Sequence, residues 1–131
     1  MKPAAFDYVR PDSVDEALEV LAASGDEARV LAGGQSLTAM LNMRLANPSV
    51  LIDIARIQDL KNISLVDGMI EVGAAVTQAA LLAWPDLVKH QPLLAQILPN
   101  VGHYQTRQRG TVCGSLAHAE SSAELPLALA T

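Results

Sequence analysis

Two glycine-bearing stretches carry the residue types that could bind an anionic ligand. The first is Val-Leu-Ala-Gly-Gly-Gln-Ser-Leu over residues 30–37, and the second is Arg-Gly-Thr-Val-Cys-Gly-Ser-Leu over residues 109–116. Glycine has no Cβ, so the backbone can turn sharply there and come close to a ligand. A turn between a strand and a helix also presents backbone N–H groups to phosphate. We expect these two stretches to act as loops that hold the two ends of one diphosphate.

The other reactive side chains give weaker signals. Ser36 lacks the Gly-x-Ser-x-Gly elbow of a nucleophilic serine and is interpreted as a helix cap. Cys113 is interpreted as a small residue tolerated in a tight loop, with a reactive thiol as the minority alternative. The histidines lie in separate segments without metal-ligand spacing, so neither a metal site nor a catalytic residue is predicted. They are His90, His103 and His118.

Charged residues surround the second glycine stretch and leave two questions open. Arg107 and Arg109 either steer a phosphate or keep the loop solvated, and the sequence favours neither interpretation. Glu120 and Glu124 either bind ribose hydroxyls, as an acidic residue does in dinucleotide folds, or form the acidic first turn of a terminal helix. The second interpretation is the simpler one. The Gly-x-Gly-x-x-Gly pattern of nicotinamide-binding folds is absent from the first stretch.

Composition limits the classes of function. The chain has 131 residues, of which 50% are hydrophobic, so it can form one sizeable core or two small lobes and is not disordered. A formal net charge of −5 argues against a nucleic-acid or anionic-membrane surface. The single cysteine fits a reducing cytoplasm. No secretory leader and no run of about 18 apolar residues is present, so no membrane span and a cytoplasmic location are expected.

Residues 1–57 predict a small parallel α/β lobe. Apolar runs indicate three strands joined by two helices with short connections. Ser13 and Glu16 have the spacing of a capping box, and Gly25 is placed to end the first helix. The strand over residues 28–32 is expected to be buried on both faces. The predicted strands cover residues 6–9, 28–32 and 50–54, and the second helix covers residues 37–44.

Residues 58–131 predict a second lobe with antiparallel pairing. Asp67-Gly68 between two short apolar runs is a strong hairpin signal. Thr77 is placed to cap a helix over residues 78–83, and Pro92 is expected to interrupt a helical stretch over residues 86–98. A terminal helix is expected to open near Ser121 and to leave an apolar face uncovered. We therefore expect an incomplete domain, or self-association through that face.

The two glycine motifs resemble the diphosphate-binding signatures of the FAD-binding (medium) subunit of molybdenum hydroxylases, the carbon monoxide dehydrogenase and xanthine dehydrogenase group. The second signature in that family reads Arg-Gly-Thr-(Ile/Val)-Gly-Gly-(Asn/Ser), followed by Ala-Asp-Pro and an acidic-Leu-Pro motif. Residues 109–126 are similar to it, and residues 6–8, 42–54 and 73–77 also resemble the family. The resemblance runs along the whole chain, and both motifs together are specific.

The resemblance implies an α+β fold: a two-lobed FAD-binding domain of the vanillyl-alcohol oxidase type. A small parallel α/β lobe would be followed by the start of an antiparallel-sheet lobe, and the domain would be truncated. Thr111 and Ser115 would add hydroxyls to the backbone cradle, and Glu124 falls on an acidic position on the adenosine side. The implied cofactor-binding residues are Ala32, Gly33, Gly34, Gln35, Ser36, Leu37, Val101, Thr111, Val112, Cys113, Gly114, Ser115 and Glu124.

The resemblance also implies a role in electron transfer. In the family, electrons pass from a molybdopterin-binding large subunit through the [2Fe–2S] clusters of a small subunit to FAD, and then to an external acceptor. The medium subunit performs no substrate hydroxylation and positions the flavin. This chain would be such a subunit or a fragment of one. The alternative is a non-enzymatic remnant or assembly module that carries no flavin.

Two departures from the family pattern carry expectations of their own. Cys113 stands where glycine is commonest, so a positive φ there would cost roughly 1 kcal/mol or more. Glu120-Ser121 replaces the common Asp-Pro, which loosens the loop. Family domains also continue well past the second signature, so we expect another chain or segment to complete the flavin pocket.

Overall fold

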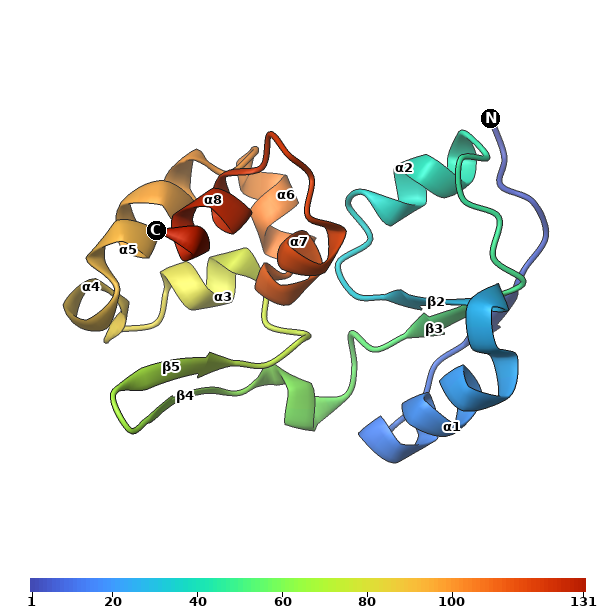
Figure 1. The fold of residues 1–131 in the computed structure, drawn as a ribbon, viewed down its shortest axis with the longest axis horizontal. Helices are drawn as coiled ribbons and strands as arrows, with labels where there is room; N and C mark the ends of the chain where they lie inside the picture. Colours follow the sequence, from blue (N-terminus) through green and yellow to red (C-terminus); the bar gives the residue numbers. More distant parts are fainter.

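The computed structural model describes residues 1–131 as two bodies of secondary structure that lie side by side (Figure 1). One holds a three-stranded sheet, and the other holds a hairpin under a group of short helices. The strands are β1 (Asp7–Val9), β2 (Ala28–Leu31), β3 (Val50–Asp53), β4 (Ile63–Val66) and β5 (Met69–Val72). The helices are α1 (Val14–Ser24), α2 (Leu37–Asn42), α3 (Gln78–Leu82), α4 (Leu87–His90), α5 (Pro92–Ile97), α6 (Tyr104–Arg109), α7 (Val112–His118) and α8 (Glu124–Ala130), and short 3₁₀ turns are η1 (Gly25–Glu27), η2 (Gln58–Lys61) and η3 (Leu98–Asn100).

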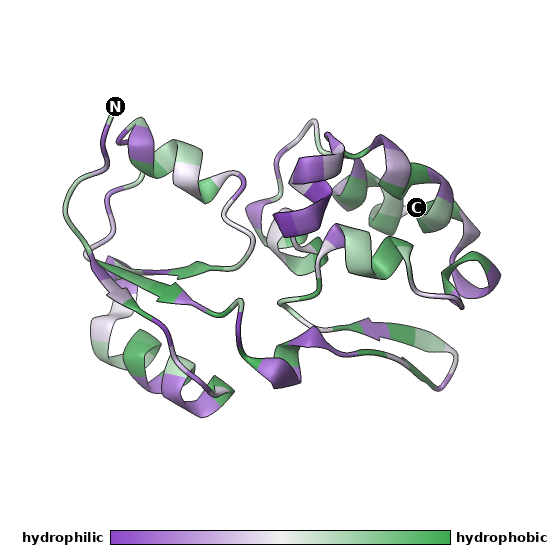
Figure 2. Cartoon of the chain, turned by 180° about the vertical axis from the view of Figure 1, so that it is seen from behind, coloured by the Kyte–Doolittle hydropathy of each residue, from purple (hydrophilic) through white to green (hydrophobic).

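The first body is the predicted parallel α/β lobe. Its strands run in the order β1-β3-β2, and both outer strands pair in parallel with β3. Helices α1 and α2 cover opposite faces of this sheet (Figure 1). Leu51 and Ile52 of the central strand are 2% and 0% exposed, which explains why β3 is the most apolar of the three. Figure 2 shows the same apolar character along β3.

The expectation that the middle strand of the sequence is buried on both faces is wrong. Strand β2 lies at an edge of the sheet, because β3 inserts between it and β1. Val30 is therefore 45% exposed, although Ala28 at the start of the strand is 3% exposed. An apolar run alone does not distinguish an edge strand from a central one.

The predicted caps of α1 are present, but the predicted cap of α2 is not. The Ser13 hydroxyl accepts from the Glu16 amide, and the Glu16 carboxylate accepts from the amide of Asp12 instead of that of Ser13. Gly25 ends α1 with φ +52°. Ser36 does not cap α2, because its backbone is already helical and its side chain makes no capping bond, whereas a capping residue needs extended backbone. Helix α2 ends at Asn42, two residues before the predicted end.

The second body begins with the predicted hairpin. Strands β4 and β5 are antiparallel, and Asp67 and Gly68 between them have φ of +50° and +80°. Positive φ at both central residues is the signature of a type I′ turn, which matches the right-handed twist of the strands. The Thr77 hydroxyl caps α3 by accepting from the Ala80 amide, and Pro92 begins α5 after the break from α4. The predicted helix caps and breaks of this segment are thus confirmed.

Helix α8 is partly covered. Leu125 and Ala128 are 0% and 7% exposed and join the core of the second body, where α8 contacts α5 and α7. Leu127 and Leu129 on its other face are 69% and 47% exposed. Only the side of α8 that carries Leu127 and Leu129 is therefore uncovered. Self-association through that side stays a prediction.

Separate cores support the two bodies. One cluster of buried residues includes Ile52, Ile54 and Ile57, and the other includes Leu81, Leu98 and Leu125. The division at residues 57 and 58 stays a prediction of domain organisation. No helix of the chain combines the length and apolar character that crossing a bilayer requires.

Candidate functional site: a cradle built from two glycine-bearing segments

The two segments meet at Gly33. A Cβ at this position would lie 2.2 Å from the carbonyl oxygen of Arg109 and 2.7 Å from the Cα of Gly110. Real Cβ atoms do not approach backbone so closely, so only glycine allows this junction. The segment after β2 thus contacts the residues that lead into α7, although more than 70 residues separate them in the sequence.

Further contacts extend the junction on both sides. A Cβ on Gly114 would lie 3.8 Å from the Cβ of Ala32, which is ordinary van der Waals contact. A Cβ on Gly110 would lie 3.5 Å from the Cγ of Gln35. Residues 32–35 and 109–114 therefore form one continuous surface. We call this surface the cradle.

The second glycine-bearing segment is not a loop throughout, which corrects the expectation for residues 111–115. Thr111 has extended backbone and caps α7, because its hydroxyl accepts from the Gly114 amide at 3.0 Å. The four residues from Val112 to Ser115 are the first turn of that helix. Threonine before a small-residue run favoured the helix, and the glycine at position 114 did not prevent it.

Segment 76–78 fixes the path of the second segment. The Val112 amide donates to the Val76 carbonyl at 3.1 Å, and the Gln78 amide donates to the Gly110 carbonyl at 2.8 Å. Thr77 and Thr111 pair between these bonds as an antiparallel bridge. The start of α3 is thereby tied to the start of α7.

Backbone N–H groups along the cradle have no partner within the protein. The amides of Gly33, Gly34, Gln35 and Ser36 donate no hydrogen bond, and neither does the amide of Cys113. Gly34 has φ +70°, a left-handed conformation that turns the segment between β2 and α2. Free amides at a glycine-rich turn are the kind of donor that binds an anion. The arrangement fits a diphosphate.

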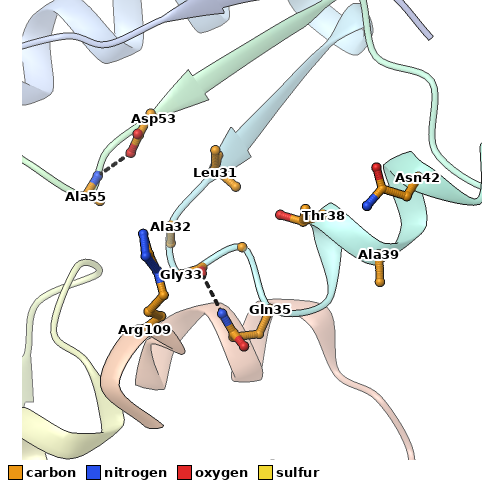
Figure 3. Close-up of a pocket in the computed structure, with 11 residues that line it drawn as sticks. Leu31, Ala32, Gly33, Gln35, Thr38, Ala39, Asn42, Asp53, Ala55 and Arg109 are labelled. Carbon is orange, nitrogen blue, oxygen red and sulfur yellow. Dashed lines mark hydrogen bonds between the residues drawn. The ribbon is translucent and has the colours of Figure 1, made fainter. Parts of the chain in front are cut away.

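A cavity of about 650 Å³ opens beside the first segment (Figure 3). Figure 3 shows the Arg109 side chain directed towards this segment from the end of α6. Arg109 makes no salt bridge, and the Asp53 carboxylate lines the same cavity. The guanidinium charge is therefore available to an anionic ligand. The lining residues that sequence reasoning missed are Leu31, Thr38, Ala39, Asn42, Asp53 and Ala55.

Asp53 lies at the carboxyl end of β3 on the wall of this cavity. Its Oδ1 accepts from the Ala55 amide at 2.9 Å, and its Oδ2 accepts a hydrogen bond from the Tyr8 hydroxyl. This hydrogen bond, with desolvation and the negative charge of Asp53, raises the pKa of the Tyr8 phenol. The carboxyl ends of parallel strands form the usual ligand-binding edge of such sheets, a topological signal that could have pointed to Asp53.

The structure answers the open question about Arg107 and gives it a third role. Its Nη1 donates to the carbonyl oxygens of Val101 and Gly102, each at 3.0 Å. Arg107 therefore braces the turn before α6, and neither steering of a phosphate nor simple solvation describes it. Of the two arginines considered, Arg109 is the one in the cavity.

Of the predicted cofactor-binding residues, only Ala32 to Gln35 line the cavity; Ser36, Leu37, residues 111–115, Val101 and Glu124 do not. Val101 is 8% exposed and packs in the core of the second body. Glu124 is exposed at the first turn of α8 and makes no hydrogen bond to the cradle. Glu120 accepts from the Ser122 hydroxyl and amide, and these bonds lower the pKa of its carboxyl. Glu120 thus holds the loop over residues 119–123, at the place where the family pattern has Asp-Pro.

Cys113 is accommodated without backbone strain. It lies inside α7, and only Arg44, Asp67 and Ala119 among the non-glycine residues have positive φ. The expected strain at Cys113 is therefore absent. Its thiol donates to the Val72 carbonyl at 3.4 Å, and burial raises the thiol pKa. A thiol with a raised pKa is less nucleophilic, which supports a structural role. No cluster of ligating side chains suited to a metal ion is present.

Comparison with known proteins agrees with this geometry. The model of the family described as "FAD binding domain in molybdopterin dehydrogenase" matches residues 4–131. The chain belongs to this family, whose cofactor is FAD. The two-lobed fold and the FAD expected from the sequence are thus confirmed, and the free amides and glycine contacts of the cradle fit the diphosphate of that cofactor.

Individual relatives cover nearly all of this chain. It is 46% identical over 129 residues to the 6-hydroxypseudooxynicotine dehydrogenase complex subunit alpha of Paenarthrobacter nicotinovorans, covering 98% of this chain and 44% of that one. It is 37% identical to the carbon monoxide dehydrogenase medium chain of Hydrogenophaga pseudoflava, covering 96% and 44%. The structure of quinoline 2-oxidoreductase from Pseudomonas putida 86 matches with TM-score 0.91 and 44% identity, again covering 96% and 44%. The chain spans less than half the length of these relatives.

Proposed function

We propose that this chain binds FAD with the cofactor's diphosphate seated in the cradle. The observation that carries the proposal is the junction at Gly33, where two segments distant in sequence meet and present unpaired amides. The backbone of residues 32–37 and 111–115 forms the contact surface. Val101 lies in the turn before α6, and Glu124 lies in α8. Both stay predicted contacts for other parts of FAD.

The residues of this chain bind and orient the cofactor. FAD, when bound, supplies one- and two-electron redox chemistry through its isoalloxazine ring. Free amides of residues 33–36 donate to anionic oxygens, and Arg109 adds positive charge next to them. These contacts do not react; they fix the position of the cofactor relative to the rest of the protein.

We infer further that the whole protein is the FAD-carrying medium subunit of a molybdenum hydroxylase in the cytoplasm. Its partners would be a molybdopterin-binding large subunit and a [2Fe–2S] small subunit, from which the FAD accepts electrons for transfer to an external acceptor. The names of two relatives, a dehydrogenase complex subunit alpha and a carbon monoxide dehydrogenase medium chain, support this assignment. The 44% share of those relatives that the chain covers makes the assembly a proposal about the whole protein.

An absorption spectrum tests the cofactor proposal. The purified chain and its Gly33→Ala variant are each mixed with FAD, desalted and scanned through the visible range. We expect flavin bands to stay with the wild-type chain and to leave the variant, because the added Cβ would push the two segments of the junction apart. Loss of flavin from both proteins would contradict the proposal and favour a module without flavin.

A further inference from the structure

Gln78 contains the one buried side-chain polar atom without a hydrogen-bond partner. The side chain is 4% exposed, and its Oε1 is unpaired. An unpaired acceptor in the interior costs folding free energy, because it loses its bonds to water and gains none. Such groups are uncommon in folded proteins and require an explanation, often a functional one.

The amide of Gln78 lies beside the cradle. Its backbone N–H donates to the Gly110 carbonyl at 2.8 Å. Its Nε2 lies 3.4 Å from the point that a Gly110 Cβ would occupy, and the Cγ of Gln35 lies 3.5 Å from the same point. The side chain of Gln78 thus fills the space that the missing side chain of Gly110 leaves, on the side where the two segments meet.

The orientation of the amide has an electrostatic consequence. The positive N–H end of the group lies beside Gly110 and donates no hydrogen bond within the protein, and the negative carbonyl end is buried and unpaired. A side chain of equal length without polar atoms would fill the same space and avoid the unpaired oxygen. Folding stability therefore does not account for an amide here, whereas an anion bound near Gly110 would be favoured by it.

We propose that Gln78 is a positioning residue of the cofactor cradle, whose side-chain N–H end lies beside the Gly110 turn and favours the diphosphate of FAD there. This inference rests on the proposed binding of FAD. It predicts that Gln78 strengthens binding of the cofactor and lowers the stability of the unliganded chain.

The test compares Gln78→Met with wild type in two measurements. Methionine keeps the length and volume and removes both polar atoms. We expect the melting temperature of the unliganded variant to rise by about 2–6 °C, because the unpaired oxygen is gone. We expect its Kd for FAD, from quenching of flavin fluorescence, to weaken about three- to tenfold. Gln108→Met, at an exposed position of α6, is the matched control and should change neither value.

The signs of the two effects separate the outcomes. A role in packing alone would lower the melting temperature and weaken binding together, which would overturn the inference. A higher melting temperature with unchanged affinity would also overturn it, since the amide would then serve no ligand. If wild type itself fails to bind FAD, the proposed function fails; if wild type binds and Gln78→Met binds equally well, only the inference fails.

A measurement on the wild-type chain covers the case in which the variant does not fold. The side-chain amide protons of Gln78 are assigned by nuclear Overhauser contacts to Gly110. We expect their NMR signals to shift on saturation with FAD, while those of Gln108 stay in place. Unshifted Gln78 signals in the FAD-saturated chain would contradict the inference.

Discussion

The carbonyl oxygen of Arg109 occupies the space where a side chain of residue 33 would begin. The distance from that oxygen to an ideal Cβ on Gly33 is 2.2 Å, far below any van der Waals contact. The approach joins the segment after β2 to the segment before α7 and so joins the two bodies at the candidate site. A cradle of this kind exists only while residue 33 is glycine.

Gly33→Ala should therefore open the junction. The added methyl group meets backbone atoms of Arg109 and Gly110, which cannot rotate away as a side chain does. We expect a loss of about 2–3 kcal/mol in the free energy of unfolding, of the size that overpacking causes. Chemical denaturation measures this loss, and titration with FAD should show at least about tenfold weaker binding.

Gly68→Asn provides the control for that change. Gly68 lies in the β4–β5 turn with open space around its Cβ position, and asparagine tolerates its positive φ. We expect less than about 1 kcal/mol of destabilisation and unchanged affinity for FAD. An alanine at position 33 that behaved like this control would refute the junction.

Thr111→Val should weaken the start of α7. Valine has the shape of threonine, but it leaves the Gly114 amide without the hydroxyl that accepts its hydrogen bond at 3.0 Å. Loss of such a cap costs about 1 kcal/mol of unfolding free energy. Thermal denaturation of the unliganded chain measures the cost, and Thr111→Ser should restore most of the lost stability.

Ser13→Ala separates capping in general from capping at the cradle. Ser13 caps α1 in the same way, by accepting from the Glu16 amide at 3.2 Å, but it is far from the second glycine-bearing segment in the chain. We expect a similar loss of stability with no change in affinity for FAD. Thr111→Val should weaken FAD binding as well as stability; if Ser13→Ala weakened FAD binding as much, the α7 cap would have no special relation to the site.

The sequence predicted the position of these elements better than their conformation. The Gly-Gly turn after β2, the Asp-Gly hairpin and the cap at Thr77 follow from local chemistry, and all are present. The helical state of residues 112–115 was missed because two glycines nearby suggested a loop. The competing signal was Thr111, a strong capping residue.

Contacts between distant segments could not be predicted from spacing. The exposed edge position of Val30 depends on β3 inserting between the other strands. The inclusion of Asp53 and Asn42 in the cavity wall depends on how the sheet and α2 are arranged in space. The brace from Arg107 to Val101 likewise needs the path of the turn before α6. Such information arises only when the elements pack.

Tyr8 should contribute a pH-dependent stabilisation. Its hydrogen bond to Asp53, with desolvation and the negative charge of that carboxylate, raises the phenol pKa above the ordinary value of 10.0. The folded state therefore holds the phenol proton more tightly than the unfolded chain. The contribution is fully present below pH about 10 and disappears as the pH rises through the raised pKa.

Denaturation of wild type and Tyr8→Phe across this range measures the effect. We expect wild type to be the more stable protein by a constant margin at neutral pH, and the margin to shrink above pH about 10. The ultraviolet difference between the two proteins should show tyrosinate forming above the ordinary pKa. A margin that grew with alkaline pH would contradict the assigned hydrogen bond.

Cys113→Gly should destabilise the chain, although glycine is the residue that the family motif favours. Cys113 is inside α7 with ordinary helical backbone, so glycine adds only conformational freedom to the unfolded state. It also removes the thiol contact with the Val72 carbonyl. We expect a loss of about 1 kcal/mol in unfolding free energy, and a smaller loss for Cys113→Ala, which keeps helix propensity. Stabilisation by glycine would instead reveal strain at this position.

Amide hydrogen exchange of the wild-type chain, with and without FAD, tests the central claim most directly. The claim is that two segments distant in sequence form one binding surface for the diphosphate. It predicts that FAD slows exchange at residues 33–36 and at residue 113 together, because these amides are unpaired in the free chain. Protection confined to one segment, or exchange unchanged at both, would contradict it.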